Sequence, residues 1–144
     1  MNEGYRYLED IAIADLAFEV QAKNLENLFK LAGKAVSNAM VLDLNSIKKE
    51  ITKDILIESE DLEILLYNFL EEIIYYKDTE GLVFSDFDVS IETNGKKKLK
   101  AKAYGEKLDY KRHETLVDVK AVTMHLFELK QKNGFWYARI VLDV

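Results

Sequence analysis

The sequence contains no cysteine and no proline, and only two of its residues are histidines. Without cysteine there are no disulfides, thiolate metal ligands or thiol nucleophiles, which fits a protein of the reducing cytoplasm. With two histidines, a nucleophilic triad has few possible members. The sequence also lacks the glycine-rich loops that bind phosphates or dinucleotides. We therefore expect no catalytic residues of these common types.

Long apolar runs are absent as well. No stretch is long enough to span a bilayer, and the first ten residues, MNEGYRYLED, are polar and acidic, unlike a signal peptide. The sequence therefore predicts a cytoplasmic protein with no membrane contact.

What is present is the composition of one folded domain. The chain has 144 residues, of which 49% are hydrophobic and 32% charged, so it can form a core beneath a well-solvated surface. No linker or repeat divides it, and we interpret residues 1–144 as a single domain. The formal net charge of −6 disfavours general nucleic-acid binding, because phosphate contacts need concentrated lysine and arginine.

The hydrophobic pattern predicts two helices and six strands. A strand over 11–21 is followed by a helix that Asn24 caps. An amphipathic strand over 47–59 leads into a second helix that starts at Ser59 and ends at Gly81. Four strands follow, and Asn-Gly turns join them in two hairpins. The order β-α-β-α-β-β-β-β predicts an α+β fold in which two helices pack against antiparallel or mixed sheet.

Two aspartates interrupt strongly apolar strands near opposite ends of the chain. Asp15 lies within EDIAIADLAFEV, and Asp143 follows the apolar run of GFWYARIVLDV. A carboxylate among apolar neighbours is costly unless something pairs with it. If the two strands meet, the carboxylates converge and need a proton or a cation between them. A hard cation accepts such oxygen ligands, with a third from Val144. The alternative is that each aspartate sits at a strand end and faces water.

Three other polar groups have simpler interpretations. The lysine run over 96–102 alternates with apolar residues, which is typical of the solvent face of an exposed or edge strand. Asp86 and Asp88 point the same way and form a solvated face, with a weak cation site as the alternative. His113 lies in a polar loop and His125 in a strand, where a hydrogen-bonded structural role is the usual one.

Several stretches together resemble the archease family. They are LEDIAIADLAFEV, the segment EDLEILLYNFLEEIIYYKDTEGLVFSDFDV, the strand VKAVTMH and the ending FWYARIVLDV. Their order and spacing fit the family across essentially the whole chain. The stretches KAVTMH and DTEGLVFS are the most distinctive of the set.

The resemblance implies a small cytoplasmic protein that is not an enzyme. It implies a cofactor of the GTP-dependent RNA-splicing ligase, which joins tRNA halves or other broken RNA in tRNA splicing and processing. Such a helper promotes guanylylation of a ligase histidine, allows multiple turnover and can broaden the nucleotide use of the ligase. The ligase is then the direct partner, and RNA is contacted only indirectly.

The resemblance also implies a metal site. The family uses an aspartate of the first strand, the penultimate aspartate and the terminal residue, which correspond to Asp15, Asp143 and Val144. The expected cofactor is a divalent cation, calcium first, with magnesium or manganese as alternatives.

The chain departs from the family motif Asp-His-Thr-Ala-Asp. Ala12 and Ile13 stand at its His and Thr positions, and its first acid is lost or displaced to Asp10. The departure puts in doubt the role of the motif histidine and the affinity of the metal. We expect the sheet edge that carries Asp15 and Asp143 to contact the ligase, with Asp10 and His125 as further contact residues.

Two other functions stay open. One is a chaperone-like interaction module for RNA-processing enzymes, which needs an exposed apolar patch and no metal. The other is a hydrolase that uses Asp15 and Asp143 as acid and base, which needs a deep pocket and turnover without a protein partner.

Overall fold

A computed structural model describes residues 2–8 and 15–144 of the chain. Within these two segments it contains seven strands, two α-helices and one 3-10 turn. The elements, in chain order, are β1 (Gly4–Leu8), β2 (Asp15–Ala22), α1 (Leu25–Met40), η1 (Leu44–Ser46), β3 (Ile51–Ser59), α2 (Leu62–Glu80), β4 (Leu82–Glu92), β5 (Lys97–Lys107), β6 (Ala121–Lys132) and β7 (Phe135–Asp143).

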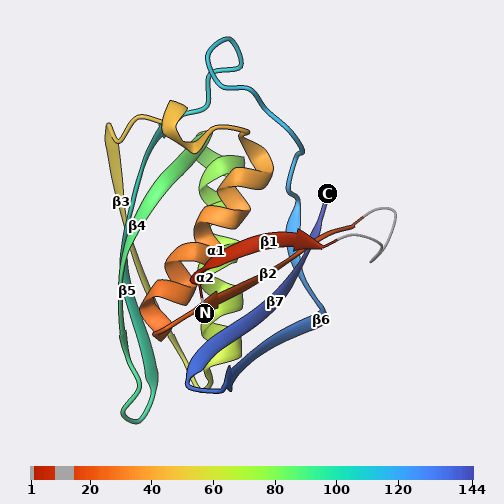
Figure 1. Cartoon of the computed structure of the whole chain (residues 1–144). Helices are drawn as coiled ribbons and strands as arrows, with labels where there is room; N and C mark the ends of the chain where they lie inside the picture. The colour runs from red at the N-terminus through yellow and green to blue at the C-terminus, as the bar shows by residue number, and fades with distance from the viewer. Residues whose placement is uncertain (1, 9–14) are drawn as a thin grey trace.

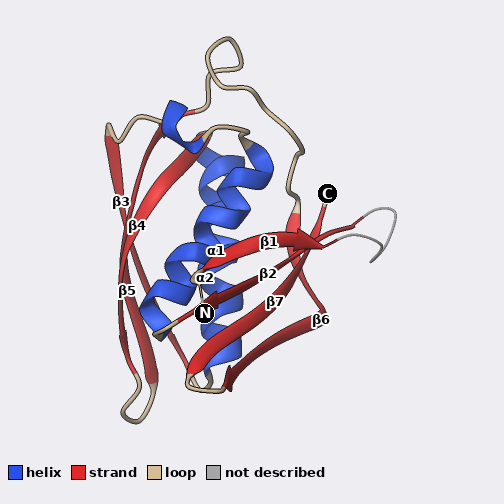
Figure 2. Ribbon diagram, viewed as in Figure 1, coloured by secondary structure: helices blue, strands red, loops and turns tan. Residues whose placement is uncertain are grey.

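The strands form two separate antiparallel sheets. One sheet has the order β1-β2-β7-β6, and the other has the order β3-β5-β4. Both helices lie between the two sheets (Figures 1 and 2), so each sheet packs one face on helices and turns the other toward solvent. The predicted α+β class is therefore confirmed, with two sheets and with β1 as a strand that the hydrophobic pattern did not indicate. The predicted start of the first long strand, residues 11–14, lies outside the described residues.

The core lies between these layers and is rich in phenylalanine. The rings of Phe29 and Phe69 bring α1 and α2 together, with centroids 6.0 Å apart. Phe87 of β4 meets Phe69 edge to face at 5.7 Å, which ties the smaller sheet to the helices. On the larger sheet, Phe18 of β2 is fully buried. The core therefore reaches the strand that carries Asp15, and it fixes the position of that strand.

The helix ends follow local signals in the sequence. Asn24 caps α1 as predicted, because its side chain accepts from the Asn27 amide at 2.8 Å. Helix α2 is capped by Asp61, which accepts from the Ile64 amide at 2.8 Å, and the predicted start at Ser59 is wrong. Ser59 is instead the last residue of β3. Gly81 ends α2 in the left-handed conformation, at φ 66°.

The two Asn-Gly turns form hairpins as predicted. Residues 93–96 join β4 to β5, and Asn133 and Gly134 join β6 to β7. Both residues of the second turn have positive φ, 52° and 82°, which is the geometry of a type I′ turn. This turn sets the register of β7 against β6.

The lysines of β5 lie in the middle of the smaller sheet. Lys98 sits between Glu58 of β3 and Glu92 of β4, and Lys102 sits between Asp54 and Asp88. Strand β5 is the central strand of its sheet, so protection of a sheet edge is not the role of these lysines. Their expected place on a solvent face is confirmed, and acidic side chains of both neighbouring strands balance their charge.

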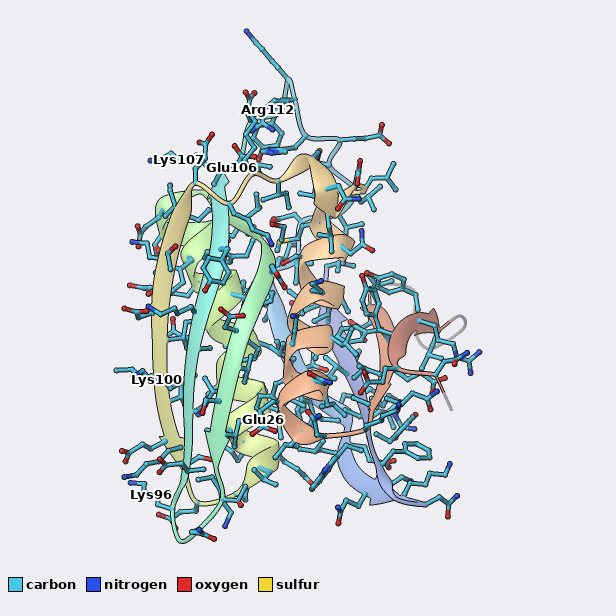
Figure 3. All side chains as sticks on the ribbon, turned by 60° about the vertical axis from the view of Figure 1, so that its left-hand side comes forward. Glu26, Lys96, Lys100, Glu106, Lys107 and Arg112 are labelled. Atoms are coloured by element: carbon cyan, nitrogen blue, oxygen red, sulfur yellow. The ribbon has the colours of Figure 1, made fainter. Side chains whose placement is uncertain are left out.

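A buried polar cluster fixes the loop that follows β5. Glu106 is 5% exposed and His113 is 2% exposed, and the His113 Nε2 lies 3.0 Å from the carboxylate. The His113 Nδ1 accepts from the Asp109 amide at 2.9 Å, so Nε2 carries the proton and donates to Glu106. Arg112 pairs with the same carboxylate, and Figure 3 shows the two side chains together at one end of the smaller sheet. The sequence pattern placed His113 only in a polar loop and missed this cluster.

No helix among the described residues is long and apolar enough to cross a membrane.

Candidate functional site

The two singled-out aspartates lie directly opposite each other. Strands β2 and β7 are antiparallel neighbours, and their register pairs Asp15 with Asp143. Side chains of directly opposed residues project from the same face of a sheet. Leu16 and Phe18 of β2 pack into the core, so the alternation of the strand places Asp15 on the outer face. The expected meeting of the two strands is confirmed.

The surroundings of the pair are half-buried and contain main-chain as well as carboxylate oxygens. Asp15, Asp143 and Val144 are all half-buried. Asp143 also pairs with Ala121 of β6, and its carbonyl oxygen accepts from the Lys120 amide at 2.8 Å. Strands β2 and β7 therefore carry the acidic edge, which we define as Asp15, Asp143 and Val144, and β6 lies beside it.

Within residues 2–8 and 15–144, no ion pair reaches either carboxylate of the acidic edge. Arg139 is the nearest basic residue on that side of β7, but its Nε donates to the Leu126 carbonyl at 2.9 Å. Its guanidinium also lies 3.7 Å from Glu128. Two carboxylates that face each other without a cationic partner repel, and a proton or a bound cation relieves that repulsion.

The oxygen atoms of the acidic edge are the kind of ligand that a hard cation prefers, but only two side chains supply them. The carboxylates of Asp15 and Asp143 are oxygen ligands of the kind that calcium and magnesium prefer. In the part of the chain that the structure describes, no three His, Cys, Asp or Glu side chains gather closely enough to bind a metal. A cation here would therefore complete its shell with main-chain oxygens, such as those of Val144, and with water. Asp10, Ala12 and Ile13 lie outside the described residues.

Asp86 is surrounded by lysines. Lys30 and Lys34 of α1 approach it to 3.5 and 3.6 Å, and Lys49 approaches it to 3.1 Å. Burial raises the pKa of Asp86, but the hydrogen bonds and these lysines outweigh it and hold that pKa below its ordinary value. Asp88 accepts a hydrogen bond from Tyr104. The weak cation site that we considered at these two aspartates is therefore not supported.

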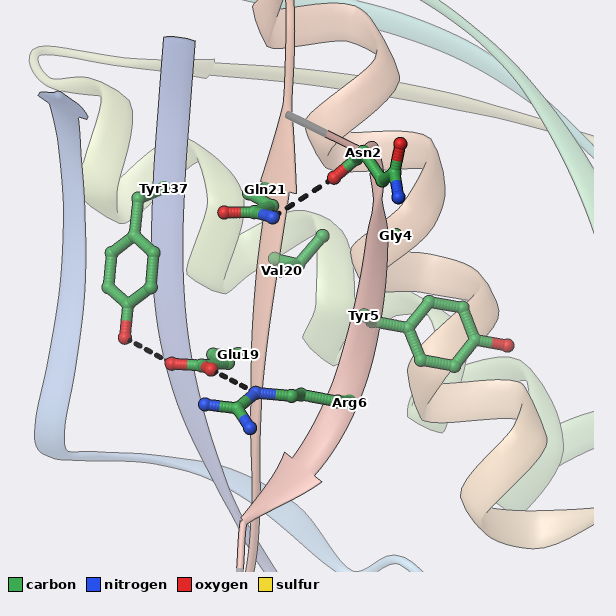
Figure 4. Close-up of a pocket in the computed structure, with 8 residues that line it drawn as sticks. All are labelled: Asn2, Gly4, Tyr5, Arg6, Glu19, Val20, Gln21 and Tyr137. Atoms are coloured by element: carbon green, nitrogen blue, oxygen red, sulfur yellow. Dashed lines mark hydrogen bonds and ion pairs between the residues drawn. The ribbon is translucent and has the colours of Figure 1, made fainter. Parts of the chain in front are cut away.

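A groove of about 390 Å³ opens beside β1 and β2, further along from the acidic edge (Figure 4). Glu19 at its floor pairs with Arg6 and accepts from the Tyr137 hydroxyl at 2.8 Å. Burial raises the pKa of Glu19, but these two hydrogen bonds bring it below its ordinary value. Burial, and then Glu19, raise the pKa of Tyr137 to about 12. Neither group is placed to exchange a proton near neutral pH, so we assign no acid–base chemistry to this groove.

His125 lies on β6, four positions after the residue that pairs with Asp143. It is exposed and belongs to an irregular stretch of β6 between Thr123 and Glu128. The sequence indicated a histidine in a regular strand, whereas the strand leaves its register there.

Comparisons with known proteins agree with the fold and with each other. Residues 5–144 match the sequence profile of the Archease protein family (MTH1598/TM1083). The chain is 44% identical to Protein archease of Pyrococcus abyssi, over 91% of this chain and 93% of that protein. It is 43% identical to Protein archease of Pyrococcus furiosus, with the same coverage.

Two solved structures are similar as well. The solution structure of Methanobacterium thermoautotrophicum protein 1598 matches with a TM-score of 0.85 and 32% identity, covering 98% of this chain and 99% of that one. The crystal structure of a Thermotoga maritima archease, described as a possible chaperone, matches with a TM-score of 0.61 over 92% and 93% of the two chains. At 17% identity, this second likeness shows the shared fold alone.

Proposed function

Because the chain belongs to the archease family, we propose that it is a non-enzymatic activator of the GTP-dependent RNA-splicing ligase. In this role it promotes guanylylation of the ligase and its multiple turnover in tRNA splicing and RNA repair, and it can broaden the nucleotide use of the ligase. The observation that carries the proposal is the register pair of Asp15 and Asp143, which places two half-buried carboxylates together on the outer face of the larger sheet.

The acidic edge would hold a divalent cation, with calcium as the first choice and magnesium or manganese as alternatives. Asp15 and Asp143 would each supply a carboxylate oxygen, and Val144 a main-chain oxygen. When bound, the cation supplies positive charge at a surface that otherwise repels anions, which would let it meet nucleotide or phosphate groups at the ligase active site. The chain's own contribution is to hold the two carboxylates in register on strands that the core keeps rigid.

The test is multiple-turnover RNA ligation by the ligase of the same organism, with and without this protein. We expect strong stimulation by the intact protein and loss of that stimulation in Asp143→Ala. The matched control is Asp54→Ala, which removes one carboxylate from an exposed position on the other sheet. It should stimulate like the intact protein.

Two outcomes would contradict the proposal in different ways. If Asp143→Ala stimulated ligation fully, the acidic edge would have no part in activation. If the intact protein did not stimulate ligation at all, the ligase role would be wrong.

The second candidate is a chaperone-like interaction module that acts without metal. Large apolar side chains at the surface, such as Met124 and Leu126, favour it. Partner binding that persisted unchanged in a chelator such as EDTA would support this candidate over the metal-dependent role.

A further inference from the structure

Strand β6 contains three extra residues opposite β7. Thr123 pairs with Val141, and the next paired residue of β6 is Glu128, opposite Arg139. Glu128 follows Thr123 by five positions, whereas Arg139 precedes Val141 by only two. We call residues 124–127 the β6 bulge. Figure 1 shows the strand changing direction sharply in this part of its course.

The β6 bulge contains a leucine in an unfavourable conformation. Leu126 has a φ of 57°, in the left-handed region. Leucine rarely adopts this region, because its Cβ crowds the backbone, and glycine or asparagine is usual there. Such outliers persist only where the surrounding structure holds them, and they concentrate at binding and catalytic sites.

Two contacts hold the bulge in this shape. The Arg139 Nε donates to the Leu126 carbonyl at 2.9 Å, from the neighbouring strand. The ring of Phe127 packs edge to face on Tyr67 of α2, with centroids 6.2 Å apart. The unusual backbone is therefore anchored on both sides, and the bulge is a fixed surface feature.

The bulge turns large apolar side chains outward. Met124 is 49% exposed and Leu126 is 43% exposed, while Phe127 between them and the core is half-buried. A regular strand would need neither the left-handed residue nor two apolar side chains in water. This combination of strain and exposure has no evident benefit for the folded monomer, which points to a binding role.

The bulge lies close to the acidic edge. Ala121 of β6 is opposite Asp143, and Met124 follows it by three positions. At the usual rise of a strand, this places Met124 roughly 10 Å along β6 from that pair. One partner can therefore contact both features.

We propose that the β6 bulge is the apolar anchor by which this protein docks on its RNA ligase. Met124 and Leu126 enter an apolar recess of the ligase, while the acidic edge, with its bound cation, faces the nucleotide site beside it. Apolar anchors near the centre of an interface carry most of its binding energy, and a pre-shaped anchor costs little to order. The inference rests on the proposed function and adds the surface that recognises the ligase.

The charges of the site favour a protein of this kind over other occupants. RNA would bring phosphates toward Asp15 and Asp143, where a bound divalent cation offsets the negative charge of the two carboxylates but does not exceed it, so the edge offers RNA no net attraction. A second copy of this chain would bring a second acidic pair, in a protein of net charge −6. A protein with an apolar recess beside a nucleotide site complements both features.

The decisive variant is Leu126→Gly. Glycine accepts φ 57° without strain, so this variant should unfold at a higher temperature than the wild type. It also removes the exposed apolar side chain, so we expect affinity for the ligase, measured by isothermal titration calorimetry, to fall about tenfold. A gain in thermal stability combined with a loss of binding cannot come from misfolding. Met124→Ser should weaken binding by a similar factor.

The matched control is Leu56→Ser, which removes a leucine that is 72% exposed on the smaller sheet and should leave ligase affinity unchanged. If Leu126→Gly and Met124→Ser bound the ligase with wild-type affinity, the docking role of the bulge would be wrong while the proposed function stood. If the wild type bound no ligase, both would be wrong. A concentration-dependent dimer that Leu126→Gly abolished in sedimentation would instead assign the bulge to self-association.

Discussion

Asp15 and Asp143 occupy directly opposed positions in the central antiparallel pair of the larger sheet. Like charges placed opposite each other in a sheet are destabilising, typically by a few tenths to about 1 kcal/mol. The described residues provide no cationic side chain that pairs with either carboxylate. The metal-free protein therefore tolerates a repulsion at this position.

Removal of one charge should stabilise the metal-free protein. Asp143→Asn keeps the shape of the side chain and removes the repulsion, so we expect the free energy of unfolding in EDTA to rise by about 0.5 kcal/mol. Urea denaturation measures this change. Asp54→Asn, which loses the exposed partner of Lys102, should show no gain. A loss of stability in Asp143→Asn would mean that the two carboxylates do not repel in the folded protein.

Addition of calcium should make the wild type more stable than Asp143→Asn, which is the reverse of their expected order in EDTA. A cation that binds only the folded state stabilises it by about 2.7 kcal/mol when present at a hundred times its dissociation constant. We expect calcium to raise the melting temperature of the wild type but not that of Asp143→Asn. Equal responses in the two proteins would place any calcium site elsewhere.

The buried carboxylate of Glu106, which is not part of the acidic edge, should stabilise the folded protein. Its carboxylate binds Arg112, His113 and the Lys48 amide, the last at 2.6 Å. Glu106→Gln removes the charge that these donors share, and we expect it to lower the free energy of unfolding by about 2 kcal/mol. The control Glu58→Gln changes a half-exposed carboxylate that pairs with Lys96 and should change stability by less than about 0.5 kcal/mol. Similar effects of the two substitutions would contradict a structural role for the cluster.

The contribution of Glu106 should disappear in acid. Burial raises its pKa, but Arg112, the Lys48 amide and His113 outweigh burial and lower that pKa from 4.5 to about 2. Because the pKa is lower in the folded state, this stabilisation is present above pH 4.5 and is lost as the pH falls toward 2. Urea denaturation at several pH values should show the stability difference between wild type and Glu106→Gln narrowing across that window. If the stability difference between wild type and Glu106→Gln stayed constant down to pH 2.5, the charge of Glu106 would not be its cause.

Gly105 of β5 should tolerate no side chain. A Cβ atom built there lies 1.9 Å from the Val83 carbonyl oxygen and 2.8 Å from the Phe84 Cα, both of them backbone atoms. We expect Gly105→Ala to lower the free energy of unfolding by about 3 kcal/mol, because the two strands must separate locally. Gly33→Ala meets only side-chain atoms, the nearest at 3.0 Å, and gains helix propensity, so its loss should be clearly smaller. Thermal melts of the two variants would compare them directly, and equal losses would contradict this account.

The parts of the fold that depend on neighbouring residues were predictable from the sequence. Asn24 at the start of α1, Gly81 at the end of α2 and the Asn-Gly turn before β7 each act through their own backbone within a few residues. The pairing of Asp15 with Asp143 was also within reach, because each aspartate adjoins a strongly apolar sequence and so requires an explanation. Both stand at strand ends, as the alternative interpretation held, but they are half-buried. That the pair binds a cation stays a prediction.

The features that depend on tertiary contacts were not predictable. The lysines of β5 appeared to protect a sheet edge, because a single strand pattern cannot show that acidic strands lie on both sides. Glu106 and His113 contact each other directly, but the fold completes their cluster with the Lys48 amide from a loop before β3, which the local sequence does not reveal. The β6 bulge was not predictable for a similar reason, since it is defined by how β6 pairs with β7 and not by the sequence of β6 alone.

Strand β2 has one neighbour nearby in the chain, β1, but its second neighbour lies in a distant part of the chain, because Ala22 pairs with Trp136 and Asp15 pairs with Asp143. Pairing between such distant residues makes closure of the sheet a late and slow event in folding. During synthesis, β1 and β2 leave the ribosome long before β7, and their two-stranded pair lacks its third strand until β7 appears. The opposed carboxylates therefore exist only in a finished molecule, so any partner that recognises them together can be engaged only after folding is complete.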